Sequence, residues 1–172
     1  GNSLIGPDFY EQQMNLLDDE ERYRINAFDW QAEFAEIMQA GGFDAVIGNP
    51  PWISLSGKFK NEVYSQEAIQ FLITYHRGNT YMPNMYEYFV AQGLTLTRGQ
   101  GYFSFIVPDR LGFNSQFVQL RKRILHEANI ISLVYKAPFP GITADTLMFV
   151  FQKGQTGLKH FVSISEYGKV EI

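Results

Sequence analysis

Short apolar runs alternate with amphipathic stretches along the chain. Four runs have the length of strands: residues 43–47, 102–107, 130–134 and 147–151. Apolar residues at helical spacing predict three helices between the runs, which begin after Asp29, after Asn84 and at Ser115. The first run is nearly continuous in apolar residues, which is typical of a strand buried on both faces of a parallel sheet. The pattern therefore predicts an α/β fold with helices on both faces of the sheet.

The last two predicted strands differ from the others in how they are connected. A short turn at residues 136–146, which contains two prolines and a glycine, links them. A parallel return needs a crossover of about a dozen residues or more, usually helical, so we expect an antiparallel hairpin here. The predicted sheet thus consists of parallel strands that end in one reversed pair.

The first strand stops abruptly at Asn49-Pro50-Pro51-Trp52. Neither proline has an amide hydrogen, and each proline keeps the preceding residue out of the helical conformation. The Asn49 side-chain oxygen and the Pro50 carbonyl can therefore point together into the crevice beyond the strand. Two fixed acceptors beside an indole suit a planar ring that carries an amino group. The alternative is a stiff turn in which Trp52 is only a core aromatic residue.

Composition narrows the possible functions. The chain has 172 residues, of which 45% are hydrophobic, enough for one core and therefore one domain. It has no cysteine, which excludes disulfides, thiolate metal sites and a cysteine nucleophile. The formal net charge of −4 is unusual for a protein that grips a duplex by itself. If the partner is a nucleic-acid duplex, we expect the main surface that binds it to lie outside this chain.

Location and metal binding are predicted from what the sequence lacks. No run approaches 18 apolar residues, and the N-terminus has no basic-then-apolar pattern. We therefore expect a soluble, cytoplasmic protein with no membrane partner; the sequence does not indicate an oligomeric state. No metal site is expected, because partners at ligand spacing are missing around all three histidines: His76, His126 and His160.

Residues 43–52 resemble the catalytic motif of the amino-group DNA methyltransferases, in the Asn-Pro-Pro-aromatic form typical of adenine-N6 enzymes. The longer context, Asn26-Ala-Phe-Asp-Trp30 followed by Gly41-Gly-Phe-Asp-Ala-Val-Ile-Gly-Asn-Pro-Pro-Trp52, is similar to the methyltransferase region of fused type II restriction-modification enzymes of the Eco57I-like group. The resemblance covers most of the chain and is weak after about residue 155. It implies the catalytic half of a Rossmann-like sheet that uses S-adenosylmethionine.

The resemblance also implies roles for individual residues. Asn49 and the Pro50 carbonyl would hold the amino group of an adenine flipped out of duplex DNA, with Pro51 shaping the turn. Trp52 would stack on the base, and Phe139, in the turn before the last strand, would face it. The alternative for Phe139 is simple packing under the hairpin.

Two weaker cofactor contacts follow from the same resemblance, at Asn2 and Asp29. Asn2 lies in a Gly-Asn-Ser-Leu stretch whose polar residue is near the cofactor's adenine in the family. The alternative is a disordered or trimmed terminus. Asp29, followed by an aromatic residue, suits the edge and face of an adenine, although its position favours an N-cap. The Gly-rich cofactor loop has no match in the chain. Residues 1–172 are therefore expected to be a partial catalytic domain, without the cofactor-loop half and the target-recognition domain, and inactive alone.

Other functions remain open for the same motif. Asn-Pro-Pro-aromatic turns also occur in methyltransferases that act on protein glutamine, on RNA or on cytosine-N4. A structural or partner-binding module that keeps the fold without catalysis is the alternative from another class. The matches at residues 26–30 and 101–110 favour a DNA adenine-N6 methyltransferase acting on duplex DNA through the full-length protein.

Overall fold

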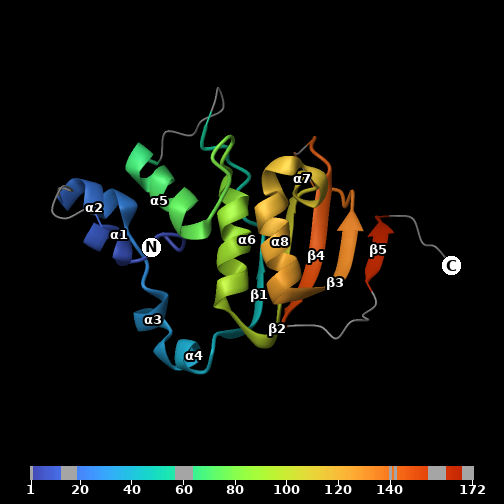
Figure 1. The fold of residues 1–172 in the computed structure, drawn as a ribbon, viewed down its shortest axis with the longest axis horizontal. Coiled ribbons are helices and arrows are strands. Elements are labelled where there is room, and N and C mark those ends of the chain that lie inside the picture. The colour runs from blue at the N-terminus through green and yellow to red at the C-terminus, as the bar shows by residue number, and fades with distance from the viewer. Residues whose placement is uncertain are drawn as a thin grey trace.

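The computed structural model of the chain describes residues 2–12, 19–56, 64–139, 141, 143–154 and 162–167. Within these residues, one five-stranded sheet is covered by helices on the face turned toward the viewer in Figure 1. The strands are β1 (Phe43–Gly48), β2 (Thr97–Pro108), β3 (Ala128–Tyr135), β4 (Thr146–Lys153) and β5 (Ser163–Glu166).

The sheet has the mixed topology that the connections predict. Its strand order is β1-β2-β4-β3-β5. β1 pairs with β2 and β3 with β5 in parallel, whereas β4 runs antiparallel to both of its neighbours. The reversed hairpin of β3 and β4 is confirmed, and so is the α/β class of the fold. The expected helices on both faces are not seen, because the described helices that pack on the sheet lie on one face.

Two helices of the main core lie side by side across the sheet (Figure 1). They are α6 (Met85–Leu96) and α8 (Val118–Glu127), and α5 (Gln66–His76) packs beside α6. The remaining helices are short: α1 (Asp8–Gln12), α2 (Asp19–Ile25), α3 (Trp30–Glu33), α4 (Ala35–Gln39), α7 (Arg110–Phe113) and a 3₁₀ turn at Ser115–Phe117. The helix expected after Asp29 is thus two short helices.

Two of the predicted helix starts differ in detail from the structure. Asn84 occupies the N-cap position of α6, but its side chain makes no capping hydrogen bond. At the other helix, Asn114 and not Ser115 accepts a bond from a backbone amide, that of Gln116, at the start of a 3₁₀ turn that leads into α8. Asparagine and serine are both good N-caps, so composition alone does not separate these neighbours.

Phenylalanines from the central strands form the core beneath α6 and α8. Phe103 and Phe105 of β2 pair in register with Phe151 and Phe149 of β4, and all four are buried. The rings of Phe149 and Phe151 stack at 4.1 Å between centroids. Truncating a buried phenylalanine to alanine typically costs about 3–5 kcal/mol. This layer therefore fixes β2, the strand against which β1 is aligned.

A second core connects the N-terminal segment to α5. Leu4, Ile5 and Phe9 are buried against residues of α5, and the rings of Phe9 and Phe71 meet edge to face at 5.0 Å. Leu55, just beyond the Asn-Pro-Pro turn, belongs to the same core. The chain on both sides of the turn is therefore anchored.

β1 is less buried than its apolar sequence predicts. It lies at one edge of the sheet that the described residues form, paired with β2 alone. Ile47 is 84% exposed, and Asp44 and Ala45 are exposed as well. The strand has the composition of a central parallel strand, but within the described chain nothing covers its outer edge.

A buried carboxyl group holds the loop between α5 and α6. Glu87 of α6 is only 3% exposed and accepts two hydrogen bonds from Asn79: one from the backbone N at 3.1 Å and one from Nδ2 at 2.6 Å. Burial raises the pKa of Glu87 to about 7, although the bonds from Asn79 act to lower it. The protein therefore carries an acid that titrates near neutral pH at the base of this loop.

The raised pKa of Glu87 predicts a pH-dependent stability. The folded state binds the Glu87 proton more tightly than the unfolded state, in which Glu87 has its ordinary pKa. The contribution of Glu87 to the free energy of unfolding is therefore complete at low pH and is lost as the pH rises through about 7. The loss is on the order of 3 kcal/mol. Urea unfolding from about pH 5 to about pH 8 should show this fall for the wild type and not for Glu87→Gln. An equal fall in Glu87→Gln, with Glu36→Gln on exposed α4 as control, would contradict the assignment.

Candidate active site

The Asn-Pro-Pro turn lies at the carboxyl end of β1, where the parallel pairing places it beside the end of β2. Gly48, the last residue of β1, is in register with Phe105 of β2. The edge of an open α/β sheet at the carboxyl ends of its strands is where such folds bind ligands. The sequence-predicted site is therefore at the expected edge of the sheet.

Within the described part of the chain, the acceptors of the turn have no hydrogen-bond donors. Asn49 is exposed and Pro50 is buried, and no bond is formed by the Asn49 side chain or by the Pro50 carbonyl. Pro50 and Pro51 have no backbone N–H groups, so they cannot donate hydrogen bonds to acceptors within the turn. The turn thus presents free acceptors at the sheet edge.

Asn49, Pro50 and Pro51 line a cavity of about 390 Å³. This volume is within the range of small-molecule sites. The other lining residues come from β1, α6, β2 and the N-terminal part: Ser3, Trp30, Val46, Ile47, Gly48, Phe89, Gln92, Gly93, Leu96 and Phe105. The lining is mostly apolar, so Asn49 and Gln92 supply much of its polar character.

Two glycines make room for the ring of Phe105 at the cavity wall. A Cβ atom at Gly48 would lie 3.1 Å from Cε1 of Phe105, and one at Gly93 would lie 3.0 Å from its Cζ. Either side chain would displace the ring, because real Cβ contacts are rarely so short. Gly48 and Gly93 therefore allow β1, β2 and α6 to approach one another next to Asn49.

Trp52 and Phe139 come together from positions 87 residues apart in the sequence. Their ring centroids are 5.8 Å apart, with an angle of 35° between the planes. Trp52 is half-buried against the main core, and its indole N–H is buried with no acceptor among the described residues. The two rings therefore pack on each other next to the turn, and the base-stacking role stays a prediction.

The two weaker cofactor candidates make mainly structural contacts. Asp29 is the N-cap of α3, where its Oδ1 accepts from the amides of Gln31 and Ala32. Asn2 accepts from the Leu4 amide and donates to the Tyr64 hydroxyl at 3.5 Å. Neither side chain lines the cavity. The capping interpretation of Asp29 is confirmed.

Their sequence neighbours, Ser3 and Trp30, do line the cavity. The Trp30 indole donates to the Ser3 carbonyl at 2.9 Å, which fixes the ring at the wall. Gln92 of α6 also lines the cavity, and its buried Oε1 has no donor among the described residues. Sequence reasoning missed Ser3 and Gln92. It noted Trp30 only as the aromatic residue after Asp29 that suits the face of an adenine.

A family model matches this chain over residues 1–139, and the family is the Eco57I restriction-modification methylases. The chain belongs to this family. Among the curated relatives of this chain are a candidate type II restriction enzyme and methyltransferase of Methanocaldococcus jannaschii, 25% identical over 152 residues, and the type II methyltransferase M.BstVI of Geobacillus stearothermophilus, 26% identical over 153. Both matches cover 87% of the chain, but only 12% and 26% of the respective relatives.

Two solved structures share the fold of this chain. A candidate class I S-adenosylmethionine-dependent methyltransferase of Listeria monocytogenes superposes with a TM-score of 0.53 at 19% identity, covering 75% of the chain and 38% of that protein. The structure of a DrdV–DNA complex superposes with a TM-score of 0.54 at 15% identity, covering 78% of the chain and 15% of DrdV. The Rossmann-like methyltransferase fold predicted from the sequence is confirmed.

The cavity fits one part of S-adenosylmethionine better than the whole cofactor. Its aromatic wall at Trp30 and its unpaired Gln92 oxygen suit a flat ring with a hydrogen-bond donor. The charged end of the cofactor would find no cationic or acidic partner in the described lining.

Across the described residues there is no group of three or more metal-binding side chains, and His160 lies outside them. None of the described helices is long and apolar enough to span a membrane.

The contact between Trp52 and Phe139 predicts a fluorescence change. The chain has two tryptophans, so Trp30→Phe leaves Trp52 as its one reporter. In that background Phe139→Ala should shift the emission of Trp52 to longer wavelength, because the ring that covers the indole is removed. Tyr23→Ala, at an exposed residue of α2, is the control. Identical spectra for Phe139→Ala and the control would show that the two rings are not in contact.

Proposed function

We propose that this chain is the catalytic half of a DNA adenine-N6 methyltransferase that transfers a methyl group from S-adenosylmethionine to an adenine flipped out of duplex DNA. The observation that carries the proposal is the free acceptor pair of Asn49 and Pro50, which borders a cavity at the carboxyl edge of the sheet. Membership of the restriction-modification methylases supports DNA as the substrate.

The chemical task is to make a poor nucleophile reactive. The lone pair of an adenine amino group is delocalised into the ring. When the Asn49 oxygen and the Pro50 carbonyl accept its two hydrogens, the nitrogen becomes more tetrahedral and its lone pair is directed at the incoming methyl group. The bound cofactor supplies that methyl group on a positively charged sulfur. Alignment and stabilisation of the developing positive charge carry the catalysis, so the chain needs no covalent nucleophile.

The wall formed by Trp52 and Phe139 is the proposed stacking surface for the base. A base inserted between two rings would require a separation of roughly 7 Å, twice the contact distance of carbon atoms. The observed 5.8 Å leaves no room for it. The target base therefore either stacks on an outer face of the pair or separates the two rings as it enters.

The exposed edge of β1 supports the proposal that the catalytic domain is incomplete here. Ile47 is 84% exposed on a strand whose apolar composition suits a central position. We propose that a parallel strand of the cofactor-loop half pairs with this edge and supplies the charged contacts that the cavity lacks. Such pairing would also protect the edge from association with other chains.

Replacing Asn49 tests the acceptor role. Asn49→Ala should lower the rate of methyl transfer by the complete protein about 10²- to 10³-fold or more, because one of two positioned acceptors is lost. Asn49→Asp retains acceptor oxygens and should keep a measurable part of the rate. Rates come from single-turnover transfer of labelled methyl groups, and Gln39→Ala on exposed α4 is the structural control. Near-normal transfer by Asn49→Ala would rule out this role.

Replacing Trp52 tests the stacking role separately. Trp52→Ala should weaken capture of the base by roughly 1–3 kcal/mol, as expected for a lost base–aromatic stack. Trp52→Phe should retain most of the affinity for the base, because it keeps an aromatic ring. The appropriate readout is the DNA concentration dependence of transfer, with circular dichroism to confirm the fold. A Trp52→Ala protein that folds normally and has an unchanged KM and kcat would leave Trp52 as a core residue only.

A further inference from the structure

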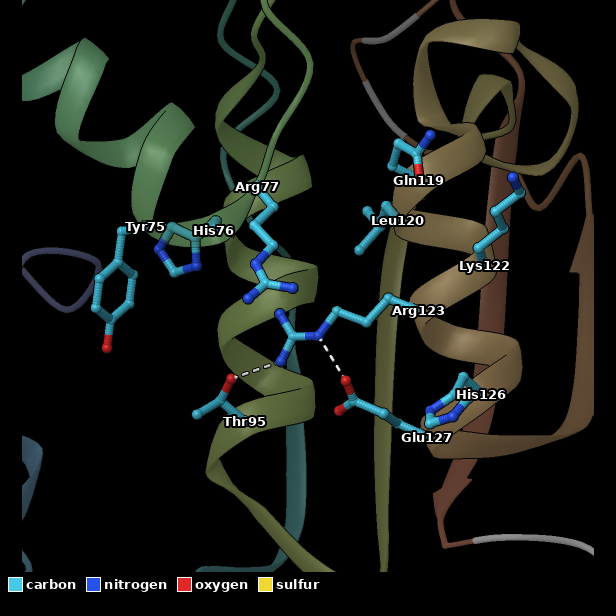
Figure 2. Close-up of a pocket in the computed structure, with 10 residues that line it drawn as sticks. All are labelled: Tyr75, His76, Arg77, Thr95, Gln119, Leu120, Lys122, Arg123, His126 and Glu127. Atoms are coloured by element: carbon cyan, nitrogen blue, oxygen red, sulfur yellow. Dashed lines mark hydrogen bonds and ion pairs between the residues drawn. The ribbon is translucent and has the colours of Figure 1, made fainter.

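A second cavity of the described chain lies away from the Asn49 cavity, at the ends of α5 and α6 and along α8. Its volume is about 850 Å³, and it shares no lining residue with the cavity at the Asn-Pro-Pro turn. Tyr75, His76 and Arg77 border it from the end of α5, and Thr95 borders it from α6 (Figure 2). The remaining lining comes from α8. We call this cavity the basic cleft, for the charges described below.

Two guanidinium groups face each other across the basic cleft. Figure 2 shows the side chain of Arg77 extending toward that of Arg123 from the opposite wall. Arg123 is held in place from two sides: its Nε donates to Glu127 at 2.9 Å, and its Nη2 donates to the Thr95 hydroxyl at 3.1 Å. Its Nη1 has no acceptor among the described residues. A group fixed in this way loses little freedom when it binds a ligand.

Arg77 reaches the cleft from a backbone conformation that arginine seldom adopts. It is the C-cap of α5 with φ 53° and ψ 42°, in the left-handed region that helix ends usually give to glycine. A residue with a Cβ atom pays a steric cost there, on the order of 1 kcal/mol. Its guanidinium makes no hydrogen bond or ion pair within the described chain. The position therefore retains a long cationic side chain at some cost to stability.

Positive charge is in excess within the basic cleft. Lys122 and His126 lie at its border on α8. Glu127, which is bonded to Arg123, is the one carboxylate among its described lining residues. His76 beneath Arg77 is only 6% exposed, and burial, with a further effect of Arg123, lowers its pKa to about 4, so it adds no charge near neutral pH. The described lining of the cleft therefore has more cationic than anionic side chains, although the whole chain has a net charge of −4.

We propose that the basic cleft binds a phosphate group between Arg77 and Arg123. A phosphate has acceptor oxygens on several sides, so it can bridge two guanidinium groups that approach from opposite walls. Glu127 already occupies one edge of Arg123, so a phosphate group would meet the remaining donors of Arg123 and the guanidinium of Arg77. The group can come from a nucleic-acid backbone or from a free phosphate compound. The proposal does not depend on the proposed methyl transfer, because it concerns another cavity and another ligand.

The test uses inorganic pyrophosphate and a short duplex oligonucleotide as probes of the full chain at low salt. Calorimetry measures the first affinity and fluorescence anisotropy the second. Arg77→Gly and Arg77→Gln should each weaken pyrophosphate binding about tenfold or more, because charge-assisted hydrogen bonds are lost. Arg24→Gln removes the same charge from an exposed position of α2 and should leave the affinity unchanged.

Arg77→Gly also separates binding from folding. Glycine adopts a φ of 53° without strain, so this variant should unfold at the same temperature as the wild type or at a higher one while it loses affinity. If the duplex affinity falls together with the pyrophosphate affinity, the phosphate belongs to nucleic acid; if the pyrophosphate affinity alone falls, it belongs to a free compound. The proposal would be overturned if the wild type did not bind pyrophosphate. It would also be overturned if the Arg77 variants bound pyrophosphate with the same affinity as Arg24→Gln.

Discussion

Two consecutive residues without amide hydrogens, Pro50 and Pro51, constrain the site. They prevent the chain from continuing the β1 ladder and keep Asn49 out of a helix. The turn consequently leaves the Asn49 side chain and the Pro50 carbonyl without partners at the sheet edge, within the described chain. Peptide groups at a strand end normally find donors in the following turn or helix. Here they remain available to a ligand.

The rest of the fold holds this turn in position. The phenylalanine layer of β2 and β4 fixes the strand against which β1 is aligned, and Gly48 and Gly93 admit Phe105 next to the turn. Leu55 anchors the chain beyond Trp52 in the second core. The polar turn is thus held from both sides by apolar packing, which preorganises the acceptors for a substrate.

Local patterns in the sequence predicted much of this arrangement. The apolar runs located β1 to β4, the short connection between β3 and β4 predicted their antiparallel pairing, and the N-cap at Asp29 is present. Features that depend on distant segments were less accessible. The cavity positions of Ser3, Trp30 and Gln92 follow from packing between elements far apart in the chain. The exposure of Ile47 depends on which strands flank β1, and that information is not contained in the composition of β1.

The structure also separates two kinds of chemistry in two cavities that both border α6. On one side is the mostly apolar cavity with the acceptors of the Asn-Pro-Pro turn, and on the other is the basic cleft with its facing arginines. The first suits a neutral ring with an amino group, whereas the second suits an anion. An acidic chain can therefore carry a local cationic site without being a general polyanion binder.

The central claim is that the acceptor pair activates the amino group of an adenine. The most direct measurement is mass analysis of nucleosides from DNA incubated with the complete protein and S-adenosylmethionine labelled in its methyl group. The account predicts a single labelled product, N6-methyladenine. A label found in N4-methylcytosine, in RNA or on protein glutamine, and not in adenine, would contradict it.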